Sequence, residues 1–413
     1  MAGKFSPKPI KPRQTIEVSG EHIVLRIILV ILLFGIAMAG VYFGVKGLLT
    51  RESGWTRVEA DSGVPAQASS DLDFEYCLTD NATAEYKMLT LLYSEGAYRA
   101  WQVYHPTQSF DGVKNLQTVN AAPNREVEVE PELYRAFETI RAKNSRTLFL
   151  APVYAQYDAV FRSLEDAEAA LYDPFYSEEA AAYVAELMGF VSDPAAVSLD
   201  LLGENRVRLN VREDYLRYAE ENGIEAYLDF CWLKNAFVLD DLAATLKAQG
   251  FTRGYLVSRE GFARYLDTAA TADYTLQLTD GSRAEVVMAA SLRIREGMSL
   301  ACLHGYSLAD STADFFYRYA DGRVVTPYLD SATGESRAAA ADLTLLSRSA
   351  SCAELALSAL PALTAETWDP AAVIALQADG VAALWFEGKT LCHTELPAEL
   401  TIAVEAYTEK TVP

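Results

Sequence analysis

Histidine, cysteine and basic residues are scarce in this chain, and each shortage excludes a class of protein. The 413 residues include 4 histidines and 5 cysteines, and the cysteines (Cys77, Cys231, Cys302, Cys352 and Cys392) are widely scattered. There is no CxxC pair and no Cys/His spacing typical of a zinc site, so we expect unpaired, mostly buried thiols. The 35 Lys and Arg residues are outnumbered by 57 Asp and Glu, which gives a net charge of −22. A nucleic-acid partner is therefore excluded, because nucleic-acid affinity comes mainly from clustered basic residues.

Apolar residues, by contrast, are plentiful. They make up 51% of the chain and charged residues 22%, a composition that can bury one large core or two ordinary ones. Near the N-terminus, an uncharged apolar run from Ile27 to Val45 is long enough to cross the hydrocarbon core of a bilayer as one helix. We therefore predict a single-pass membrane anchor over residues 26–49.

The charges around this run predict its orientation. Basic residues between Lys4 and Arg13 precede it, and the chain after it is strongly acidic. The positive-inside rule then places residues 1–25 in the cytoplasm as a basic tail and the large domain outside the cell. An alternative stays open, because Ala37-Met38-Ala39 resembles a signal-peptidase site after a short apolar core. The continuation of the run to Val45 favours an uncleaved anchor in the cell membrane.

Residues 50–73 are polar, rich in small residues and without periodicity, so we expect a linker before a domain over 74–413. In that domain Leu133, Phe137 and Ile140 recur at helical spacing, and Glu130-Pro131 is typical of a helix start. Further helices are expected over 82–93 and 178–191, and strands over 196–203, 206–211, 226–230, 253–259, 274–279, 283–292, 315–320, 323–329 and 340–347. Because helices and strands mix without strict βαβ alternation, the fold class is α+β.

The stretch "DFCWLKNAFVLD", from Asp229 to Asp240, carries the most informative pattern. It joins an expected strand to a helix that is expected to open at Asp240, with Lys234 and Asn235 at the turn. The next strand ends in "SREG", closed by Gly261. This order resembles the central signature of the FAD:protein FMN transferases, the ApbE-type flavin transferases. In that family the turn reads Asp-x-Gly-Gly-Ile-Ala-Lys-Gly-Tyr-Ala-x-Asp, and a Gly-Gly pair follows the next strand.

Three further stretches fall in the order of the same family. "YHPTQSFDGVKNLQTVNAAPNREVEVEPELYRAFE" resembles its early segment, "DGRVVTPYLDSATGES" its His-Ile-Ile-Asp-Pro-x-Thr-Gly turn, and "SASCAELALSALPAL" its Ala-Asp-x-x-x-Thr helix. The resemblance spans roughly residues 76–390 and implies a mixed-sheet, T-fold-type α+β domain.

The resemblance also implies a chemistry and a set of residues. Such a protein moves FMN from FAD onto a Ser or Thr hydroxyl of an exported protein with the help of a divalent metal such as Mg²⁺, so an exported redox protein is an expected partner. The two implied metal ligands lie four residues apart on one helix face and carry oxygens suited to magnesium. The implied flavin-binding residues are Asp229, Lys234, Asn235, Asp240, Gly261 and Asp330, and the implied metal ligands are Glu354 and Ser358.

Several key residues of the family are replaced here. An overlay without gaps puts Cys231 and Trp232 on the two glycines, Asn235 on the lysine, and Pro327 on the histidine of the later turn. The indole of Trp232 is expected to be buried and to fill space that a pyrophosphate or adenine would otherwise occupy. These replacements predict a pseudoenzyme with impaired or absent transfer. The alternative function is a non-catalytic binding or scaffold protein of an extracytoplasmic flavin or electron-transfer assembly.

The candidate site residues also have simpler interpretations. Glu354 and Ser358 are equally typical of the polar stripe of an amphipathic helix. Lys234 and Asn235 are compatible with an ordinary turn. His304 lies close to Cys302 in the sequence, but no third group that would orient the histidine is visible, which favours a structural pair over nucleophilic catalysis.

Overall fold

The computed structural model describes residues 23–49, 51–266, 274–281, 286–306 and 315–413, and the chain forms two compact units, Met1–Glu52 and Ser53–Pro413. The first unit contains helix α1 (Ile23–Leu49), whose apolar side chains, including Leu29 and Phe34, are exposed. Among the described residues, no helix combines the length and the apolar character needed to cross a membrane.

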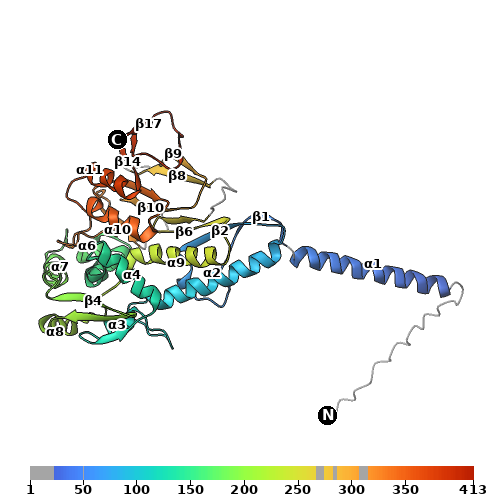
Figure 1. Ribbon diagram of the computed structural model, residues 1–413, viewed down its shortest axis with the longest axis horizontal. Helices are drawn as coiled ribbons and strands as arrows, with labels where there is room; N and C mark the ends of the chain where they lie inside the picture. Colours follow the sequence, from blue (N-terminus) through green and yellow to red (C-terminus); the bar gives the residue numbers. More distant parts are fainter. Residues whose placement is uncertain (1–22, 50, 267–273, 282–285, 307–314) are drawn as a thin grey trace, which may run out of the picture. The chain divides into compact units, whose positions relative to one another are not determined.

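The second unit is built on a nine-stranded sheet with the order β1-β2-β6-β7-β10-β13-β14-β15-β17 (Figure 1). Neighbouring strands are antiparallel except for β15 and β17, which are parallel. The strands of this sheet are β1 (Gly54–Arg57), β2 (Leu72–Leu78), β6 (Gly254–Ser258), β7 (Phe262–Tyr265), β10 (Met298–His304), β13 (Asp342–Ser347), β14 (Ala382–Glu387), β15 (Thr390–His393) and β17 (Thr408–Thr411).

Three smaller sheets complete the strands described by the structure. Their orders are β16-β9-β8, β3-β5-β4 and β11-β12. The strands are β3 (Glu126–Glu128), β4 (Val197–Gly203), β5 (Arg206–Val211), β8 (Tyr274–Asp280), β9 (Val287–Ile294), β11 (Tyr317–Arg318), β12 (Val324–Val325) and β16 (Glu399–Ile402).

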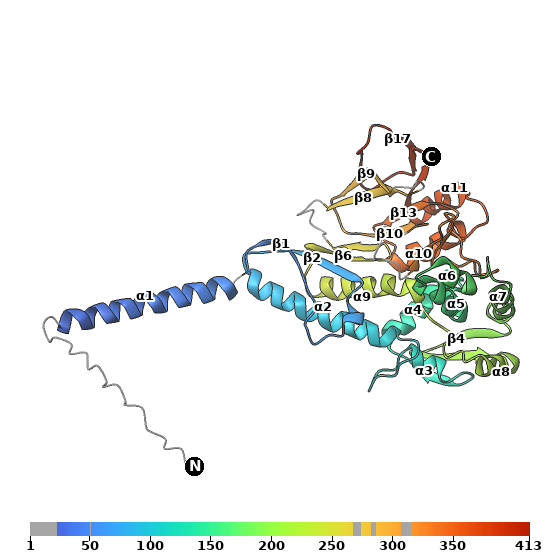
Figure 2. The ribbon, with the colours of Figure 1, turned by 180° about the vertical axis from the view of Figure 1, so that it is seen from behind.

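The helices of the second unit gather on one side of the large sheet (Figures 1 and 2). α9 contacts β6 and β7, α10 contacts β10 and β13, and α2 packs on α9. The helices are α2 (Ala82–Tyr104), α3 (Leu116–Asn120), α4 (Pro131–Ala142), α5 (Ala151–Arg162), α6 (Asp166–Tyr172), α7 (Glu178–Val191), α8 (Glu213–Glu221), α9 (Lys234–Ala248), α10 (Cys352–Leu363) and α11 (Pro370–Ile374), with 3₁₀ turns η1 (Ala66–Ala68), η2 (Thr147–Leu150), η3 (Cys231–Leu233) and η5 (Ala375–Asp379).

The central strands of the large sheet are buried on both faces, between two hydrophobic cores. Leu345 belongs to the core on the helix side, whereas its neighbour Leu346 belongs to a second core with Leu278 of β8 and Leu292 of β9. Successive side chains of a strand point to opposite faces, so β13 contributes to both cores. Its six residues are accordingly all buried.

The α+β prediction is confirmed, and several elements agree closely with the sequence patterns. α7 covers 178–191, and α4 begins at Pro131 with Glu130 at its N-cap. All five cysteines are free; Cys302 is among the three that are buried, whereas Cys77 and Cys231 are half-buried.

Three segments differ from the sequence-based expectation. Residues 226–230 form no strand, because the backbone N–H of Leu228 donates to the Asn120 side chain and that of Asp229 donates to the Leu148 carbonyl. The segment expected to be a linker, 50–73, contains β1, which pairs with β2. The helix expected to open at Asp240 begins at Lys234.

Candidate functional site

The turn between Asp229 and Lys234 keeps a glycine-like backbone without a glycine. Cys231 has φ +50°, a left-handed conformation that costs an L-residue other than glycine roughly 1–2 kcal/mol. The Asp229 carboxylate supports this turn by accepting the Cys231 N–H at 3.1 Å. The overlay with the family signature places a glycine at this position, so the backbone path suits the family turn although the residue does not.

Trp232 is buried, as predicted from the sequence. It is 1% exposed, its ring stacks on Phe262 with centroids 5.8 Å apart, and it meets Tyr328 edge to face at 5.0 Å. Aromatic contacts of this kind add to the free energy gained by burial. The indole therefore fills the interior beside the turn.

A cleft of about 610 Å³ opens on the other side of this turn. Asp229, Cys231 and Lys234 line it together with Tyr154 and His105. Burial raises the pKa of Asp229 above its usual value. Burial and the Lys234 ammonium group both lower the pKa of His105. The Lys234 ammonium group forms no hydrogen bond or ion pair with any described residue, so it is available to a ligand in the cleft.

Asn235 points away from this cleft and contacts a carboxylate that the sequence patterns did not single out. Its side chain is buried, and Nδ2 donates to Oε1 of Glu260 at 2.7 Å. Burial raises the pKa of Glu260 from 4.5 to about 7. A carboxyl group that titrates near neutrality inside a protein is a candidate acid or base.

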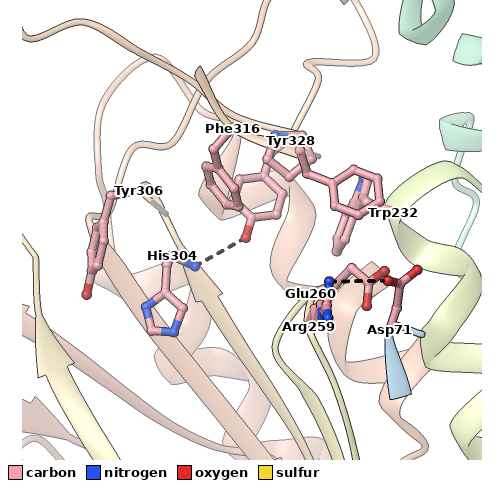
Figure 3. A pocket seen from close by; sticks show the side chains of 10 residues that line it. Asp71, Trp232, Arg259, Glu260, His304, Tyr306, Phe316 and Tyr328 are labelled. Atoms are coloured by element: carbon pink, nitrogen blue, oxygen red, sulfur yellow. Dashed lines mark hydrogen bonds and ion pairs between the residues drawn. The ribbon is translucent and has the colours of Figure 1, made fainter. Parts of the chain in front are cut away.

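Glu260 lines a second, smaller cavity of about 50 Å³, which Figure 3 shows with its side chains. His304 lines the same cavity, and its Nδ1 lies 2.8 Å from Oδ1 of Asp342, a residue that is 5% exposed. The Tyr306 hydroxyl donates to the same carboxylate. Burial, and then the Asp342 charge, raise the pKa of Tyr306. His304 is thus held by a buried carboxylate and not by Cys302.

The implied metal ligands are occupied by structural contacts at helix α10. Ser351 and Glu354 form a capping box, in which the Glu354 carboxylate accepts the Ser351 N–H at 2.8 Å. The Ser358 hydroxyl accepts from Lys143 Nζ at 2.9 Å. No group of three or more His, Cys, Asp or Glu side chains among the described residues is arranged to hold a metal ion. These residues do not fit a magnesium site as they stand.

Asp240 also serves the N-terminus of α10. Its two carboxylate oxygens accept the N–H groups of Cys352 at 3.0 Å and Ala353 at 3.1 Å, which are among the helix donors that have no partner within the helix. Burial raises the pKa of Asp240, and the nearby Arg264 lowers it in part. Asp240 therefore joins α9 to α10.

The remaining two candidates lie in tight backbone turns. Gly261 has φ +98°, and a Cβ atom there would lie 2.0 Å from the carbonyl oxygen of Cys302, so close packing of β7 on β10 requires glycine. Asp330 accepts the N–H groups of Ala332 and Thr333, both at 2.8 Å, in a side-chain-stabilised turn.

The structure thus brings together only part of the predicted site. Asp229 and Lys234 share the large cleft, whereas Asn235 reaches the smaller cavity through Glu260. Asp240 and Glu354 meet at the start of α10, and Gly261 and Asp330 line neither of these two cavities. The sequence patterns missed Glu260 and Asp342. The "SREG" stretch pointed near Glu260, but no local pattern pointed to Asp342.

Comparison with solved structures identifies the class of this fold as that of the flavin transferases. The chain is similar to the ApbE protein from Thermotoga maritima, with a TM-score of 0.54 and 12% identity over 81% of this chain and 94% of that one. It is also similar to the flavin transferase ApbE from Vibrio cholerae, with a TM-score of 0.53 and 11% identity over 81% of this chain and 93% of the other. The sequence matches no protein-family model and no curated protein. The predicted resemblance to the ApbE-type flavin transferases is confirmed at the level of the fold.

Proposed function

We propose that the protein is a membrane-anchored, extracytoplasmic flavin-transferase-like protein in which transfer of FMN from FAD to Ser or Thr of exported proteins is impaired or lost. Such a transfer needs charge neutralisation on the phosphates, an aligned hydroxyl and a proton acceptor. The ApbE fold supports the class, and the replaced residues support the loss of transfer.

The observation that carries this proposal is the packing of Trp232. The indole is 1% exposed between Phe262 and Tyr328, where the family signature has a glycine that lets the backbone approach a diphosphate. Cys231 adds a second side chain to the same turn. The oxygens of Glu354 and Ser358 are engaged in protein contacts, so they are less available to bind a metal ion.

Lys234 is the residue that supports a remaining flavin contact. It lines the 610 Å³ cleft and is the nearest cation to the position of the family lysine. An ammonium group there can bind a phosphate as a point charge. If FAD still binds, Lys234 is expected to contact its phosphates.

A transfer assay tests the proposal directly. The full chain in detergent is incubated with FAD, Mg²⁺ and a Ser/Thr acceptor peptide, and covalently bound flavin is followed by in-gel fluorescence. We expect no flavinylated peptide from this chain and robust labelling from an active flavin transferase in parallel. Magnesium-dependent flavinylation by the unmodified chain would contradict the proposal.

The anchor and the location of the domain rest on the sequence. The run from Ile27 to Val45 and the basic residues before it support a single pass with the N-terminus in the cytoplasm. An exported redox protein is the partner that this location suggests. Protease added to intact protoplasts should remove the large domain, and complete protection of the domain would refute this topology.

A further inference from the structure

The small cavity beside Trp232 has aromatic walls and a size suited to a small polar group. Its volume is about 50 Å³, and the rings that line it are Trp232, Tyr306, Phe315, Phe316 and Tyr328. A water molecule occupies roughly 30 Å³ of liquid, so the cavity accommodates a group of only a few heavy atoms. Figure 3 shows Glu260 and His304 among the side chains around it.

His304 presents a hydrogen-bond acceptor to this cavity. The buried Asp342 carboxylate receives His304 Nδ1, the Tyr306 hydroxyl and the Gly281 N–H. A carboxylate oxygen accepts, so His304 Nδ1 is the donor in this pair, and an imidazole ring with its one hydrogen on Nδ1 presents Nε2 as an acceptor. Nε2 has no hydrogen-bond partner among the residues that the structure describes. It is therefore an acceptor without a donor.

Glu260 presents a second acceptor. Its Oε1 accepts from Asn235 Nδ2 at 2.7 Å, whereas its Oε2 is buried without a hydrogen-bond partner within the described ranges, although the nearby Ser258 hydroxyl lowers the pKa of Glu260 in part. A buried carboxylate oxygen without a donor is costly. A ligand that donates to it would remove this cost.

The charges around the cavity favour a cation over an anion. The charged residues that line it are Asp71, Arg259 and Glu260, with Arg259 and Asp71 paired at 3.8 Å. Among the residues that line the cavity, the unbalanced charge is that of the ionised Glu260, and the Lys234 ammonium group acts on it from outside the lining. Aromatic faces also attract cations through their quadrupoles.

We propose that this cavity binds a small protonated primary amine, an alkylammonium group, which donates to Glu260 Oε2 and His304 Nε2 while its charge lies against the aromatic rings. The group can belong to a free amine or to the end of a longer ligand. Trp232, which lies in the turn that aligns with the family's phosphate-binding loop, forms one wall of this site, but binding of the amine requires no flavin chemistry.

Methylammonium is the probe of choice because it has two heavy atoms and the required donors. The chain has four histidines, so the imidazole resonances of the full chain labelled with ¹⁵N-histidine can be assigned individually in detergent. At pH 8 we expect saturable shifts of the His304 Nε2 resonance with a Kd of roughly 10 mM or weaker, because a ceiling of about −1.5 kcal/mol per heavy atom limits a ligand of two heavy atoms. Methanol, which is neutral and similar in size, should shift it far less.

Two variants separate this site from unspecific binding. Glu260→Gln keeps the acceptor for Asn235 but removes the charge, and should weaken methylammonium binding by about tenfold or more. Glu138→Gln, at an exposed position on α4, should leave the Kd unchanged.

Three results would overturn the proposal. The first is an absence of His304 shifts up to 100-fold above the expected Kd, and the second is an equal response to methanol, which would indicate a water site. The third is independent of any variant: a His304 ring with its hydrogen on Nε2 would remove the histidine acceptor that the proposed two-point contact requires.

Discussion

Replacing Glu260 with glutamine should change the pH dependence of folding stability in a defined direction. The glutamine keeps an oxygen for the Asn235 amide, which donates to Oε1 at 2.7 Å, but it does not titrate. In the wild-type chain, the pKa of Glu260 rises from 4.5 to about 7 on folding because the group is buried. The folded state therefore keeps this proton at a pH at which the unfolded chain has released it, so the wild-type carboxyl destabilises the fold increasingly as the pH rises from 4.5 to about 7.

The size of the effect follows from linkage between protonation and folding. With pKa values of 4.5 unfolded and about 7 folded, ionisation of Glu260 lowers the free energy of unfolding by about 3 kcal/mol at pH 8 and by about 1 kcal/mol at pH 5. The stability of Glu260→Gln relative to wild type should thus increase by roughly 2 kcal/mol between pH 5 and pH 8.

Urea unfolding of both proteins at a series of pH values, followed by tryptophan fluorescence, measures this difference. Contributions from all other titrating groups cancel to first order when the two curves are subtracted. Glu138→Gln serves as the control and should run parallel to wild type. A Glu260→Gln curve that is also parallel to wild type would show that Glu260 titrates normally, and the description of this carboxyl group would be wrong.

Four further changes test other contacts. Cys231→Gly should leave the free energy of unfolding unchanged or raise it by up to about 1 kcal/mol, because glycine adopts the left-handed conformation without strain but gains entropy in the unfolded chain. Cys231→Val should clearly lower the urea midpoint. Trp232→Ala should cost about 3–5 kcal/mol in urea unfolding, and a loss below about 1 kcal/mol would show that the indole is poorly packed. Glu354→Ala should cost roughly 0.5–2 kcal/mol through loss of the capping box, whereas Glu354→Gln, which also forms such a box, should cost little; equal losses would speak against the capping role. Lys234→Ala should raise the pKa of His105, measured by NMR titration, because Lys234 lowers it in the wild type, and an unchanged value would place the ammonium group away from the imidazole.

Local patterns in the sequence predicted many individual elements and, through the order of four weak motifs, the fold. The helix start at Glu130-Pro131 depends on neighbouring residues alone, and the structure confirms it. The failure at 226–230 has a physical cause, because a short buried apolar run looks the same whether its backbone pairs in a sheet or, as here, bonds to Asn120 and Leu148.

The candidate site was less predictable because its contacts join distant parts of the chain. His304 and Asp342 are 38 residues apart and meet through the pairing of β10 with β13, which no spacing in the sequence indicates. The role of Glu354, however, was visible: Ser351-x-x-Glu354 before an apolar run is the capping-box pattern. The left-handed conformation of Cys231 was not visible, because cysteine carries no preference for it.

The burial of β10 and β13 between two apolar cores has a consequence for how their alignment is specified. In a strand with one solvent-exposed face, a shift by one residue would expose apolar side chains to water, which strongly disfavours the misaligned state. Here a shift would merely exchange side chains between two apolar compartments, so hydrophobicity discriminates poorly against it. Alignment of β10 with β13 must come from a contact that fits at one position only, the cross-strand pair of His304 with Asp342. On the other side of β10, the close approach of Gly261 to Cys302, whose N–H donates to the Gly261 carbonyl at 2.8 Å, does the same for β7. The polar pair thus keeps the two strands aligned, whatever ligand the neighbouring cavity binds.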